Sequence, residues 1–437
     1  MTRSATLRGA ERTSLDGESA DVLVCGASFA GLAIARELAG SGADVLLVDR
    51  YEVGERATSA CAAPRPWLEA MGVAGSIRQE IPCMSFHTPH GSVRYQLPWS
   101  WAAFDYRELC QLLFDQTDAR FEIATVTGRG DGGVLTDRGV LRAPLVVDAL
   151  GWRRVLAGEP NQPPEAPLSR GLEVHPHGGA RDLEVWIERS LVRYGYGWSV
   201  PAGDELRVGV GSYEPRDHVR RPTVELAERL ARDPVRYQGN WFPHRLRRAA
   251  QDDVFFAGDS AGHCFPLSGE GIRTAFYFGI ACGRELRSVL SGERSRDEAL
   301  RSYARLSGSH SRAFGLALRL QWLVPRLPPR MLTFALRALD RQALVDRAFG
   351  WYLNQAHPAC ISADRSAAPS RAVPLYGAPV VVRARRNPLR RNRAHEPRAN
   401  RLGTKTWKRR GSGKPQQSAG SKGPNNHSAS RLSDRRQ

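Results

Sequence analysis

The sequence predicts an α/β protein with three parts: a domain that starts with a βαβ unit, an inserted domain built on an antiparallel sheet, and a helical carboxyl-terminal region. Two short apolar runs, Asp21–Gly26 and Asp44–Asp49, flank the Ala- and Leu-rich segment Phe29–Gly40, which is the pattern of a βαβ start. Gly171–Tyr213 has the turns and alternation of antiparallel strands. Ala299–Leu344 has mostly helical spacing.

The first apolar run ends in a glycine-containing turn, G-A-S-F-A-G at residues 26–31. This turn matches the G-x-G-x-x-G fingerprint of Rossmann-like dinucleotide-binding domains except that Ser28 replaces the middle glycine. A helix amino terminus after such a turn faces a pyrophosphate. Asp49 ends the second strand, where a carboxylate accepts hydrogen bonds from an adenosine ribose. An ordinary glycine turn is the alternative. The candidate cofactor-binding residues of this unit are Gly26, Ala27, Ser28, Ala30, Gly31, Asp49 and Arg50.

A second motif at residues 254–272 is more informative. An apolar strand is followed by Gly258-Asp259, and the Asp259 carboxylate is placed to bind the ribityl hydroxyls of a flavin. A turn and a helix follow, and a helix amino terminus stabilises the anionic pyrimidine edge of a reduced flavin. We therefore expect FAD as the cofactor. The further candidate cofactor-binding residues are Arg107, Asp148, Gly258, Asp259, Gly269, Gly271 and Ile272.

Taken together, these segments resemble the p-hydroxybenzoate hydroxylase fold, and more closely the geranylgeranyl reductase superfamily of FAD enzymes, over about residues 20–350. The second motif has the Gly-Glu-Gly-Ile ending of those reductases, where aromatic hydroxylases usually have Gly-Gln-Gly followed by Asn. The segment 196–201 (YGWSVP) is similar to their Tyr-x-Trp-x-Phe-Pro motif, and Cys61 stands where they carry a cysteine. The chain departs from the pattern at Ala62, Arg193 and Val200.

The resemblance implies reduction of carbon–carbon double bonds in an isoprenoid, lipid or quinone side chain by reduced FAD, with electrons from NAD(P)H or a ferredoxin. It implies Cys61, Tyr196 and Trp198 as catalytic candidates. Each has a structural alternative: a small buried thiol for Cys61, and core packing for the two aromatic residues. Glu270 and His263 are further proton-source candidates, although a helix cap and an ordinary loop histidine are the favoured interpretations.

An FAD-dependent monooxygenase of an aromatic or polyketide substrate is the alternative function, and the Gly-Glu-Gly-Ile ending argues against it. A flavin halogenase needs a lysine in the body of the protein. All four lysines lie after Val381, so that interpretation is weak. Phe314–Leu339 is apolar with interleaved arginines. It is either a helical cap on the substrate domain, which we favour, or a segment that lies on a membrane surface.

The positive charge of the 437-residue chain is concentrated at one end. The net charge is +18, but the residues from Val381 onward hold 17 basic and 2 acidic residues, which leaves +3 for residues 1–380. A cationic body, as in a compact DNA-binding domain, is therefore not expected. A solvated extension is the favoured interpretation of the tail, and nucleic-acid binding through Arg383–Arg410 is the alternative.

The seven cysteines are scattered and form no C-x-x-C pair, so neither a metal site nor a disulfide framework is expected. Residues 1–20 lack an apolar signal core, and no run of about 18 apolar residues occurs. The sequence therefore predicts a cytoplasmic protein, with peripheral membrane contact as a secondary expectation. Its expected partners are an apolar small-molecule substrate and an electron-donor protein.

The predicted domain boundaries follow the motifs. We expect a flexible amino terminus at 1–19, a discontinuous FAD-binding domain at 20–82, 105–160 and 245–310, a substrate-binding domain at 83–104 and 161–244, carboxyl-terminal helices at 311–360, and a basic disordered tail at 361–437.

Overall fold

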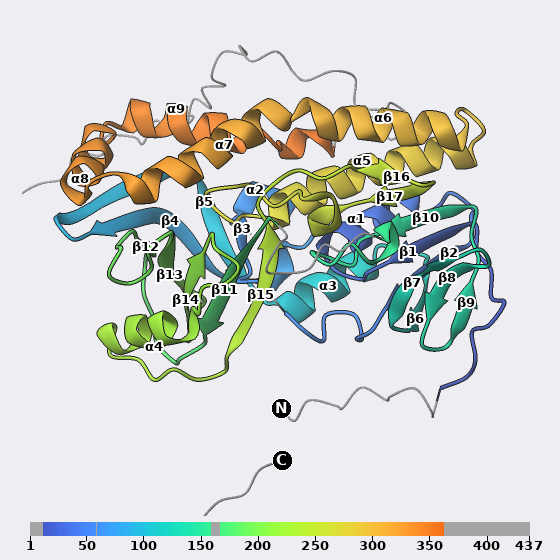
Figure 1. The fold of residues 1–437 in the computed structure, drawn as a ribbon, viewed down its shortest axis with the longest axis horizontal. Coiled ribbons are helices and arrows are strands. Elements are labelled where there is room, and N and C mark those ends of the chain that lie inside the picture. The colour runs from blue at the N-terminus through green and yellow to red at the C-terminus, as the bar shows by residue number, and fades with distance from the viewer. Residues whose placement is uncertain (1–11, 58, 159–166, 362–437) are drawn as a thin grey trace, which may run out of the picture. The chain divides into compact units, whose positions relative to one another are not determined.

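The structure is a computed structural model that describes residues 12–57, 59–158 and 167–361 (Figure 1). The chain divides into two contact units, Met1–Leu375 and Tyr376–Gln437, and every described residue belongs to the first unit. Apart from its first residue, the predicted tail 361–437 lies outside the described residues. The first eleven residues of the predicted flexible amino terminus 1–19 also lie outside them.

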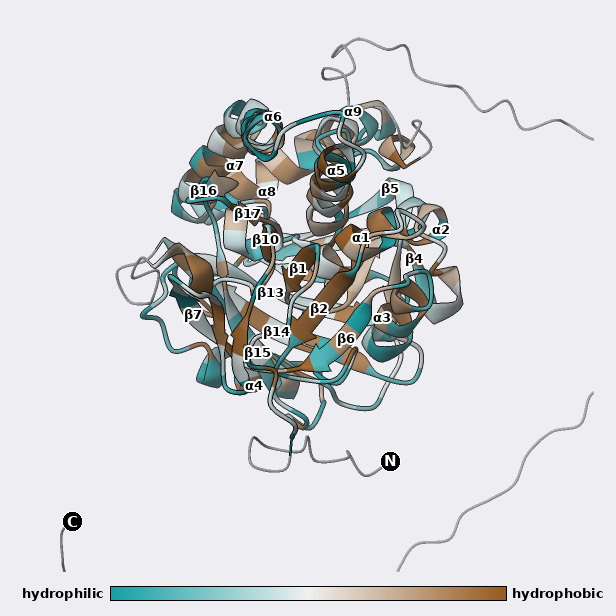
Figure 2. Cartoon of the chain, turned by 90° about the vertical axis from the view of Figure 1, so that its right-hand side faces the viewer, coloured by the Kyte–Doolittle hydropathy of each residue, from teal (hydrophilic) through white to brown (hydrophobic). Residues whose placement is uncertain are grey.

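One sheet of the described chain is mainly parallel and has the strand order β16-β17-β10-β1-β2-β6. Its strands are β1 Val22–Cys25, β2 Val45–Asp49, β6 Arg120–Ile123, β10 Leu145–Asp148, β16 Ala250–Gln251 and β17 Val254–Phe256. Within this sheet, β16 alone runs antiparallel to its neighbour. Every residue of β1 and β10 is buried, as expected for strands that are covered on both faces. Figure 2 shows the hydrophobic character of β1 and β2.

Helices α1 (Phe29–Leu38) and α5 (Ile272–Leu290) pack closely against each other beside this sheet. The close approach depends on glycines of α5. A Cβ atom at Gly279 would lie 2.8 Å from the carbonyl oxygen of Ala30, and one at Gly283 would lie 2.6 Å from Cβ of Glu37. These small residues therefore let α5 bring its amino terminus next to the start of α1.

A second, mostly antiparallel sheet has the order β15-β11-β14-β13-β12-β4-β5-β3. Its strands are β3 Ala62–Pro64, β4 Ile77–Thr88, β5 Gly91–Phe104, β11 Leu168–Val174, β12 Leu183–Trp186, β13 Gly195–Pro201, β14 Leu206–Ser212 and β15 Gln238–Pro243. Helix α4 (Arg220–Arg229) covers one face of the sheet, where Leu226 packs with Val208 and Val210. The opposite face carries the polar and aromatic residues described below.

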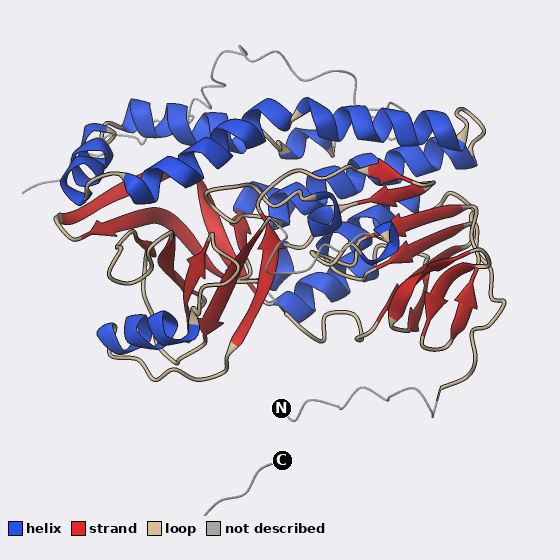
Figure 3. Ribbon diagram, in the orientation of Figure 1, coloured by secondary structure: helices blue, strands red, loops and turns tan. Residues whose placement is uncertain are grey.

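The remaining elements are short or belong to the helical layer, which Figure 3 shows as a separate group of helices above the two large sheets. A small antiparallel sheet is formed by β7 Val126–Gly130, β8 Gly133–Thr136 and β9 Gly139–Leu141. The other helices are α2 Arg65–Ala70, α3 Tyr106–Phe114, α6 Arg296–Ser309, α7 Ser311–Leu323, α8 Pro329–Ala338 and α9 Gln342–Leu353. Single 3₁₀ turns occupy η2 Ala74–Ser76, η3 Val155–Ala157, η4 Gly258–Ala261, η5 Val324–Arg326 and η6 Pro358–Cys360.

The predicted α/β class is confirmed, including the βαβ start, the antiparallel sheet and the carboxyl-terminal helices. The predicted domain boundaries remain a prediction. The structure places β3 and the first residues of β4 in the antiparallel sheet, although residues 20–82 were predicted to belong to the FAD-binding domain. Among the described residues, no helix combines the length and the apolar character needed to cross a bilayer.

Candidate functional site

The carboxyl ends of four parallel strands meet at one edge of the mainly parallel sheet. Cys25 at the end of β1 is in register with Asp148 of β10 and with Val48 of β2, and Asp148 is in register with Phe256 of β17. The loops that follow these strands therefore lie side by side. Ligands of open α/β sheets bind at this edge.

Two glycines, Gly26 in the turn after β1 and Gly31 in the first turn of α1, leave no room for a side chain. Gly26 has a φ of +112°, and a Cβ atom there would lie 2.3 Å from the carbonyl oxygen of Ala149. A Cβ atom at Gly31 would lie 1.8 Å from the carbonyl oxygen of Gly26. No side chain caps α1 at its amino-cap residue, and the first turn of α1 contains no acidic residue. Its first amide groups therefore suit an anion such as a pyrophosphate.

Ser28 fits the position of the missing glycine. Its φ of −120° is extended backbone, which any residue adopts, so the turn does not need glycine there. The Ser28 hydroxyl accepts a hydrogen bond of 3.0 Å from the Tyr106 hydroxyl. Ala30 lies on the adjoining turn of α1, where its Cβ atom would lie 3.1 Å from a Cβ atom added at Gly258. The two predicted flavin motifs thus contact each other.

Asp49 ends β2 beside the same turn. Its Oδ2 accepts from the amide of Ala27 at 2.8 Å, and its Oδ1 accepts from the amide of Tyr51 at 3.1 Å. Burial raises the pKa of Asp49. Each carboxylate oxygen can accept a further hydrogen bond, as a ribose hydroxyl would require. The Arg50 guanidinium lies 4.9 Å from the Tyr51 ring centre, and Arg107 is exposed on α3.

Asp148 binds protein groups with both of its oxygens. Its Oδ1 accepts from the Ser260 hydroxyl at 2.6 Å and from the amide of Leu150 at 3.0 Å. Its Oδ2 accepts from the amide of Leu156 at 2.8 Å. Burial raises the pKa of this fully buried carboxyl. Asp148 therefore ties the loop after β10 to the loop after β17, and its predicted contact with the cofactor remains a prediction.

Asp259 is different, because its carboxylate has no hydrogen-bond partner within the described residues. Its Oδ1 atom lies 3.6 Å from the position of a Cβ atom at Gly271, so a carboxylate oxygen lies beside the backbone where α5 begins. Burial raises the pKa of Asp259 to about 6, although nearby Arg247 favours the charged form. A mostly buried, unpartnered carboxylate suits a ligand that brings hydroxyl donors.

Glu270 has the structural role favoured from the sequence. Its Oε1 accepts from the amide of Arg273 at 3.0 Å in the first turn of α5, and its Oε2 accepts from Nε of Arg273 at 2.9 Å. Gly269, just before it, has a φ of +64° and shapes the turn that leads to Gly271 and Ile272. His263 is fully buried and stacks on Phe278 with ring centres 3.7 Å apart, which is a packing position.

Cys61 lies in a strained, buried loop before β3. Its φ is +50°, an unusual value for a residue with a side chain, and 3% of its surface is exposed. Its thiol donates to the carbonyl oxygen of Ser59 at 3.0 Å, and its own carbonyl accepts from Nη1 of Arg207 at 2.9 Å. Burial raises the pKa of the Cys61 thiol to about 12, so the thiol is protonated at neutral pH.

The Trp198 ring lies against glycine residues on one face of the antiparallel sheet. A Cβ atom at Gly209 would lie 2.3 Å from Cζ2 of Trp198, and atoms at Gly211 and Gly171 would lie 3.3 Å and 3.5 Å from its ring. Tyr196, two residues earlier on β13, has its ring centre 5.9 Å from that of Trp198. The Tyr196 hydroxyl donates to the carbonyl oxygen of Ser268. The aromatic face is thus joined to the turn at residues 265–269 of the second motif.

A buried polar cluster beside Trp198 was not predicted from the sequence. Glu173 is 3% exposed; its Oε2 accepts from Nε1 of Trp198 at 3.1 Å, and its Oε1 lies 2.9 Å from Nε2 of His175. Gln238 donates from Nε2 to Oε1 of Glu173 and to the carbonyl oxygen of Ser59, both at 2.8 Å. This cluster connects the loop of Cys61 to Trp198. The sequence signal for it is a Glu and a His two residues apart at the end of a predicted strand, and this signal does not identify Trp198 and Gln238 as their partners.

These residues fit FAD. The pyrophosphate would be held by the turn with Gly26 and Gly31 and by the uncapped start of α1. The ribityl chain would be held by the unpartnered Asp259. The aromatic face with Tyr196 and Trp198 is joined to the turn that leads into α5. Whether Cys61, Tyr196 and Trp198 take part in the reaction remains a prediction.

Comparisons with known proteins also indicate an FAD-dependent enzyme. The family model described as FAD dependent oxidoreductase matches residues 21–117. A menaquinone reductase of Mycolicibacterium smegmatis is 24% identical over 76% of this chain and 91% of its own length. A digeranylgeranylglycerophospholipid reductase of Methanothermobacter thermautotrophicus is 25% identical over 65% of this chain and 81% of its own.

Solved structures share the fold. A geranylgeranyl bacteriochlorophyll reductase-like protein of Thermoplasma acidophilum superposes with a TM-score of 0.67 at 16% identity, over 79% of this chain and 98% of that one. A probable FAD-dependent monooxygenase of Pseudomonas aeruginosa also shares the fold, with a TM-score of 0.55 at 17% identity, over 76% of this chain and 100% of that one. The site and the sequence relatives together lead to one conclusion: residues 21–117 form an FAD-dependent oxidoreductase domain, and the chain is a homologue of proteins named menaquinone reductase and digeranylgeranylglycerophospholipid reductase.

Proposed function

We propose that the protein reduces carbon–carbon double bonds in the isoprenoid chain of a lipid or quinone. The observation that carries this proposal is the bond from the Tyr196 hydroxyl to the carbonyl of Ser268, which joins an aromatic face to the predicted flavin turn. Trp198, Tyr213 and Tyr196 contribute rings to that face. This aromatic face suits a substrate with an apolar, flexible chain.

The residues of the site have distinct tasks in this proposal. When bound and reduced, FAD supplies a hydride, and reduction of an alkene needs one proton as well. The Cys61 thiol, whose pKa burial raises, is one candidate proton source. His175, whose Nε2 lies 2.9 Å from Oε1 of Glu173, is the other. The aromatic face excludes water from the reacting carbons. NAD(P)H or a ferredoxin would supply the electrons.

The names of the curated relatives support a reductase, and the Gly-Glu-Gly-Ile sequence at residues 269–272 agrees with it. Monooxygenation is the competing reaction on the same fold. The test is an anaerobic incubation of the reduced holoenzyme with geranylgeranyl and polyprenyl lipids, followed by mass spectrometry. The proposal expects a product that has gained two hydrogens. A product that forms only in air and has gained one oxygen atom would establish the monooxygenase instead.

The proposed setting is the cytoplasm, with the apolar substrate drawn from a membrane. The charged tail from Val381 onward has no part in this proposal, and its predicted form as a solvated extension lies outside the described residues.

A further inference from the structure

Exposed apolar side chains are concentrated on two consecutive helices, α7 and α8, and the segment after them. Ten large apolar side chains are prominently exposed in the described residues, and seven of these lie between residues 316 and 344. The three most exposed are Phe334 at 74%, Trp322 at 61% and Met331 at 58%. We call the outward side chains of α7 and α8 the α7–α8 face; they are Leu316, Arg319, Trp322, Leu323, Arg330, Met331, Phe334 and Arg337.

The charge of the same segment has one sign. Residues 311–339 contain five arginines and no aspartate or glutamate. Arg319 and Arg330 are exposed beside the apolar residues of the α7–α8 face. The face is therefore both apolar and cationic.

The inner side of α8 is fixed to the antiparallel sheet, so the outward direction of Met331 and Phe334 is set by the fold. The Thr333 hydroxyl lies 2.7 Å from that of Thr88 in β4. The Tyr95 hydroxyl of β5 donates to the carbonyl of Leu336 at 2.6 Å. The exposed side chains are thus the outer half of a firmly docked helix.

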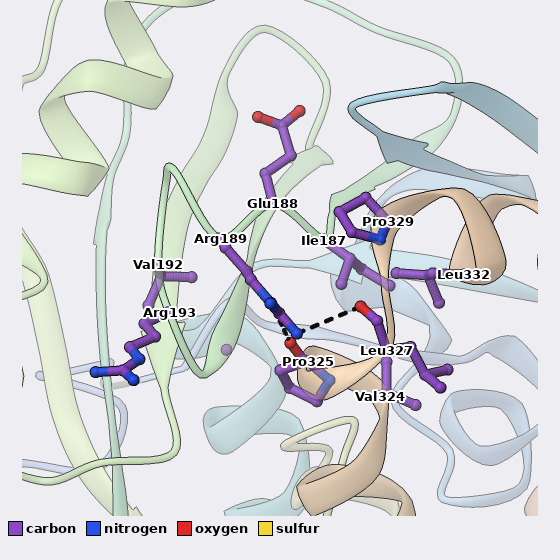
Figure 4. A pocket seen from close by; sticks show the side chains of 11 residues that line it. Ile187, Glu188, Arg189, Val192, Arg193, Val324, Pro325, Leu327, Pro329 and Leu332 are labelled. Atoms are coloured by element: carbon purple, nitrogen blue, oxygen red, sulfur yellow. Dashed lines mark hydrogen bonds between the residues drawn. The ribbon is translucent and has the colours of Figure 1, made fainter.

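The corner between α7 and α8 is also anchored, as Figure 4 shows. The Arg189 guanidinium donates to the carbonyl oxygens of Pro325 at 2.7 Å and Leu327 at 3.4 Å. The cavity beside Arg189 and Pro325 measures about 10 Å³, which is room for about one water molecule, so it is not a substrate site. Arg189 instead holds the corner against the loop between β12 and β13.

We propose that the α7–α8 face docks on the surface of a lipid bilayer that contains anionic headgroups. In this orientation Trp322, Met331 and Phe334 enter the interface between headgroups and acyl chains, and the exposed arginines reach lipid phosphates. A second copy of the chain fits less well, because a twofold contact of this face with itself brings arginines against arginines. The chain's own tail is not the proposed occupant, because its net charge of +15 from Val381 onward has the same sign as the charge of the face.

The docking helix also contacts the candidate site. On the inner side of α7, Oε1 of Gln321 accepts from the amide of Leu267 at 2.8 Å, and Phe314 packs on Phe265 with ring centres 5.0 Å apart. Leu267 and Phe265 belong to the turn that holds Tyr196. A docked protein would therefore meet lipid substrates close to its site. Only this route for the substrate rests on the proposed function; docking itself does not.

Co-sedimentation of the full-length protein with vesicles tests the docking. Vesicles of phosphatidylcholine, with and without phosphatidylglycerol, are used at low and at high salt, because high salt suppresses binding through the tail. We expect the double variant Met331→Ser with Phe334→Ser to lose at least about tenfold in vesicle affinity at high salt. Val235→Ser with Tyr237→Ser, which removes exposed apolar groups at 41% and 44% exposure elsewhere, should bind like the wild type.

A charge variant completes the test. Arg319→Gln with Arg330→Gln should reduce the preference for phosphatidylglycerol, and Arg301→Gln with Arg305→Gln on the exposed side of α6 should not. Unchanged binding of the Met331/Phe334 variant, or binding that high salt abolishes for all variants alike, overturns the proposal. Light scattering that shows a dimer which the Met331/Phe334 variant dissociates would assign the face to a second copy and overturn it too. Activity on a short, water-soluble isoprenoid tests the proposed reaction separately.

Discussion

The indole Nε1 of Trp198 donates a hydrogen bond of 3.1 Å to Oε2 of Glu173, in a place where both side chains are largely removed from solvent. The bond runs between neighbouring regions of one sheet face, from β13 to β11. It fixes the plane of the indole over Gly209 and Gly211, and it places a carboxylate next to the aromatic face. Glu173 in turn binds His175 and Gln238. Trp198 is therefore both part of the predicted substrate wall and part of a buried polar cluster.

Trp198→Phe removes this bond and keeps an aromatic ring. A hydrogen bond to a charged group contributes roughly 1.5–3 kcal/mol, so we expect kcat/KM for an isoprenoid substrate to fall by about tenfold or more, with unchanged FAD content. Trp241→Phe is the matched control, because the Trp241 indole makes only a 3.4 Å bond to the Pro215 carbonyl. Full activity of the Trp198 variant, or loss of FAD from it, would contradict the role given to Trp198.

Gly31→Ala should abolish FAD binding, because its Cβ atom would lie 1.8 Å from the carbonyl of Gly26 and would force the phosphate turn apart. Gly315→Ala is the control. Gly315 lies within α7, has no atom near the position of an added Cβ, and should gain up to about 1 kcal/mol from better helix propensity. The measurement is flavin absorbance of each protein after reconstitution with FAD. Retention of FAD by the Gly31→Ala variant would show that the turn does not bind the cofactor.

FAD affinity should rise as the pH increases through about 6. Burial raises the pKa of Asp259 to about 6, and only the ionised carboxylate accepts hydrogen bonds with both oxygens from ribityl hydroxyls. The stability of the apoprotein has the opposite dependence. In the folded apoprotein the pKa of Asp259 lies above its unfolded value of 3.8. Asp259 therefore contributes to the free energy of unfolding below pH 3.8, and this contribution is lost as the pH rises towards about 6.

Titration calorimetry of FAD binding between pH 5 and pH 8, a range of about 3 units around the Asp259 pKa, tests this dependence. Asp259→Asn should bind FAD more weakly and lose the part of the pH dependence that ends near 6. Asp252→Asn, which changes an exposed residue of the turn before β17, should retain it. The same pH dependence in wild type and Asp259→Asn would remove Asp259 from the cofactor site.

Glu270→Gln should destabilise the protein strongly. Glu270 and Arg273 form a buried ion pair with 2.8 Å between Oε2 and Nη2, and the Tyr352 hydroxyl donates to the same Oε2 atom at 2.8 Å. Removal of one partner of a buried pair costs roughly 3–5 kcal/mol. Glu69→Gln breaks the exposed pair with Arg65 and should cost at most about 1 kcal/mol. Urea unfolding at saturating FAD compares the two; equal losses would contradict the structural role of Glu270.

The flavin motifs were predictable from the sequence because each is local. β1, β2 and β17 are short apolar runs that lead into Gly or Asp, and the parallel register brings those ends to one edge. Asp148 shows the limit of this reasoning. Its place at a strand end follows from the sequence, but the direction of its side chain depends on Ser260, which is distant in the chain.

The polar cluster was not predictable in the same way, because it depends on strand order. Glu173, Trp198 and Gln238 come from three different strands, and they meet because the sheet places β11 between β15 and β14, with β13 next. Alternation along one strand indicates which residues share a face, but it does not identify the neighbouring strand. Gln238 also contacts Ser59 in the loop of Cys61, and these two residues are far apart in the sequence.

The most direct test of the proposed reaction is flavin reoxidation without oxygen. The purified holoenzyme is reduced under argon, an excess of a polyprenyl lipid is added, and the visible absorbance of oxidised flavin is followed together with the product. We predict that flavin is reoxidised in step with formation of a product that has gained two hydrogens, one product per flavin. Flavin that stays reduced with geranylgeranyl, polyprenyl and quinone substrates, and is reoxidised only when air is admitted, would contradict the proposed reaction.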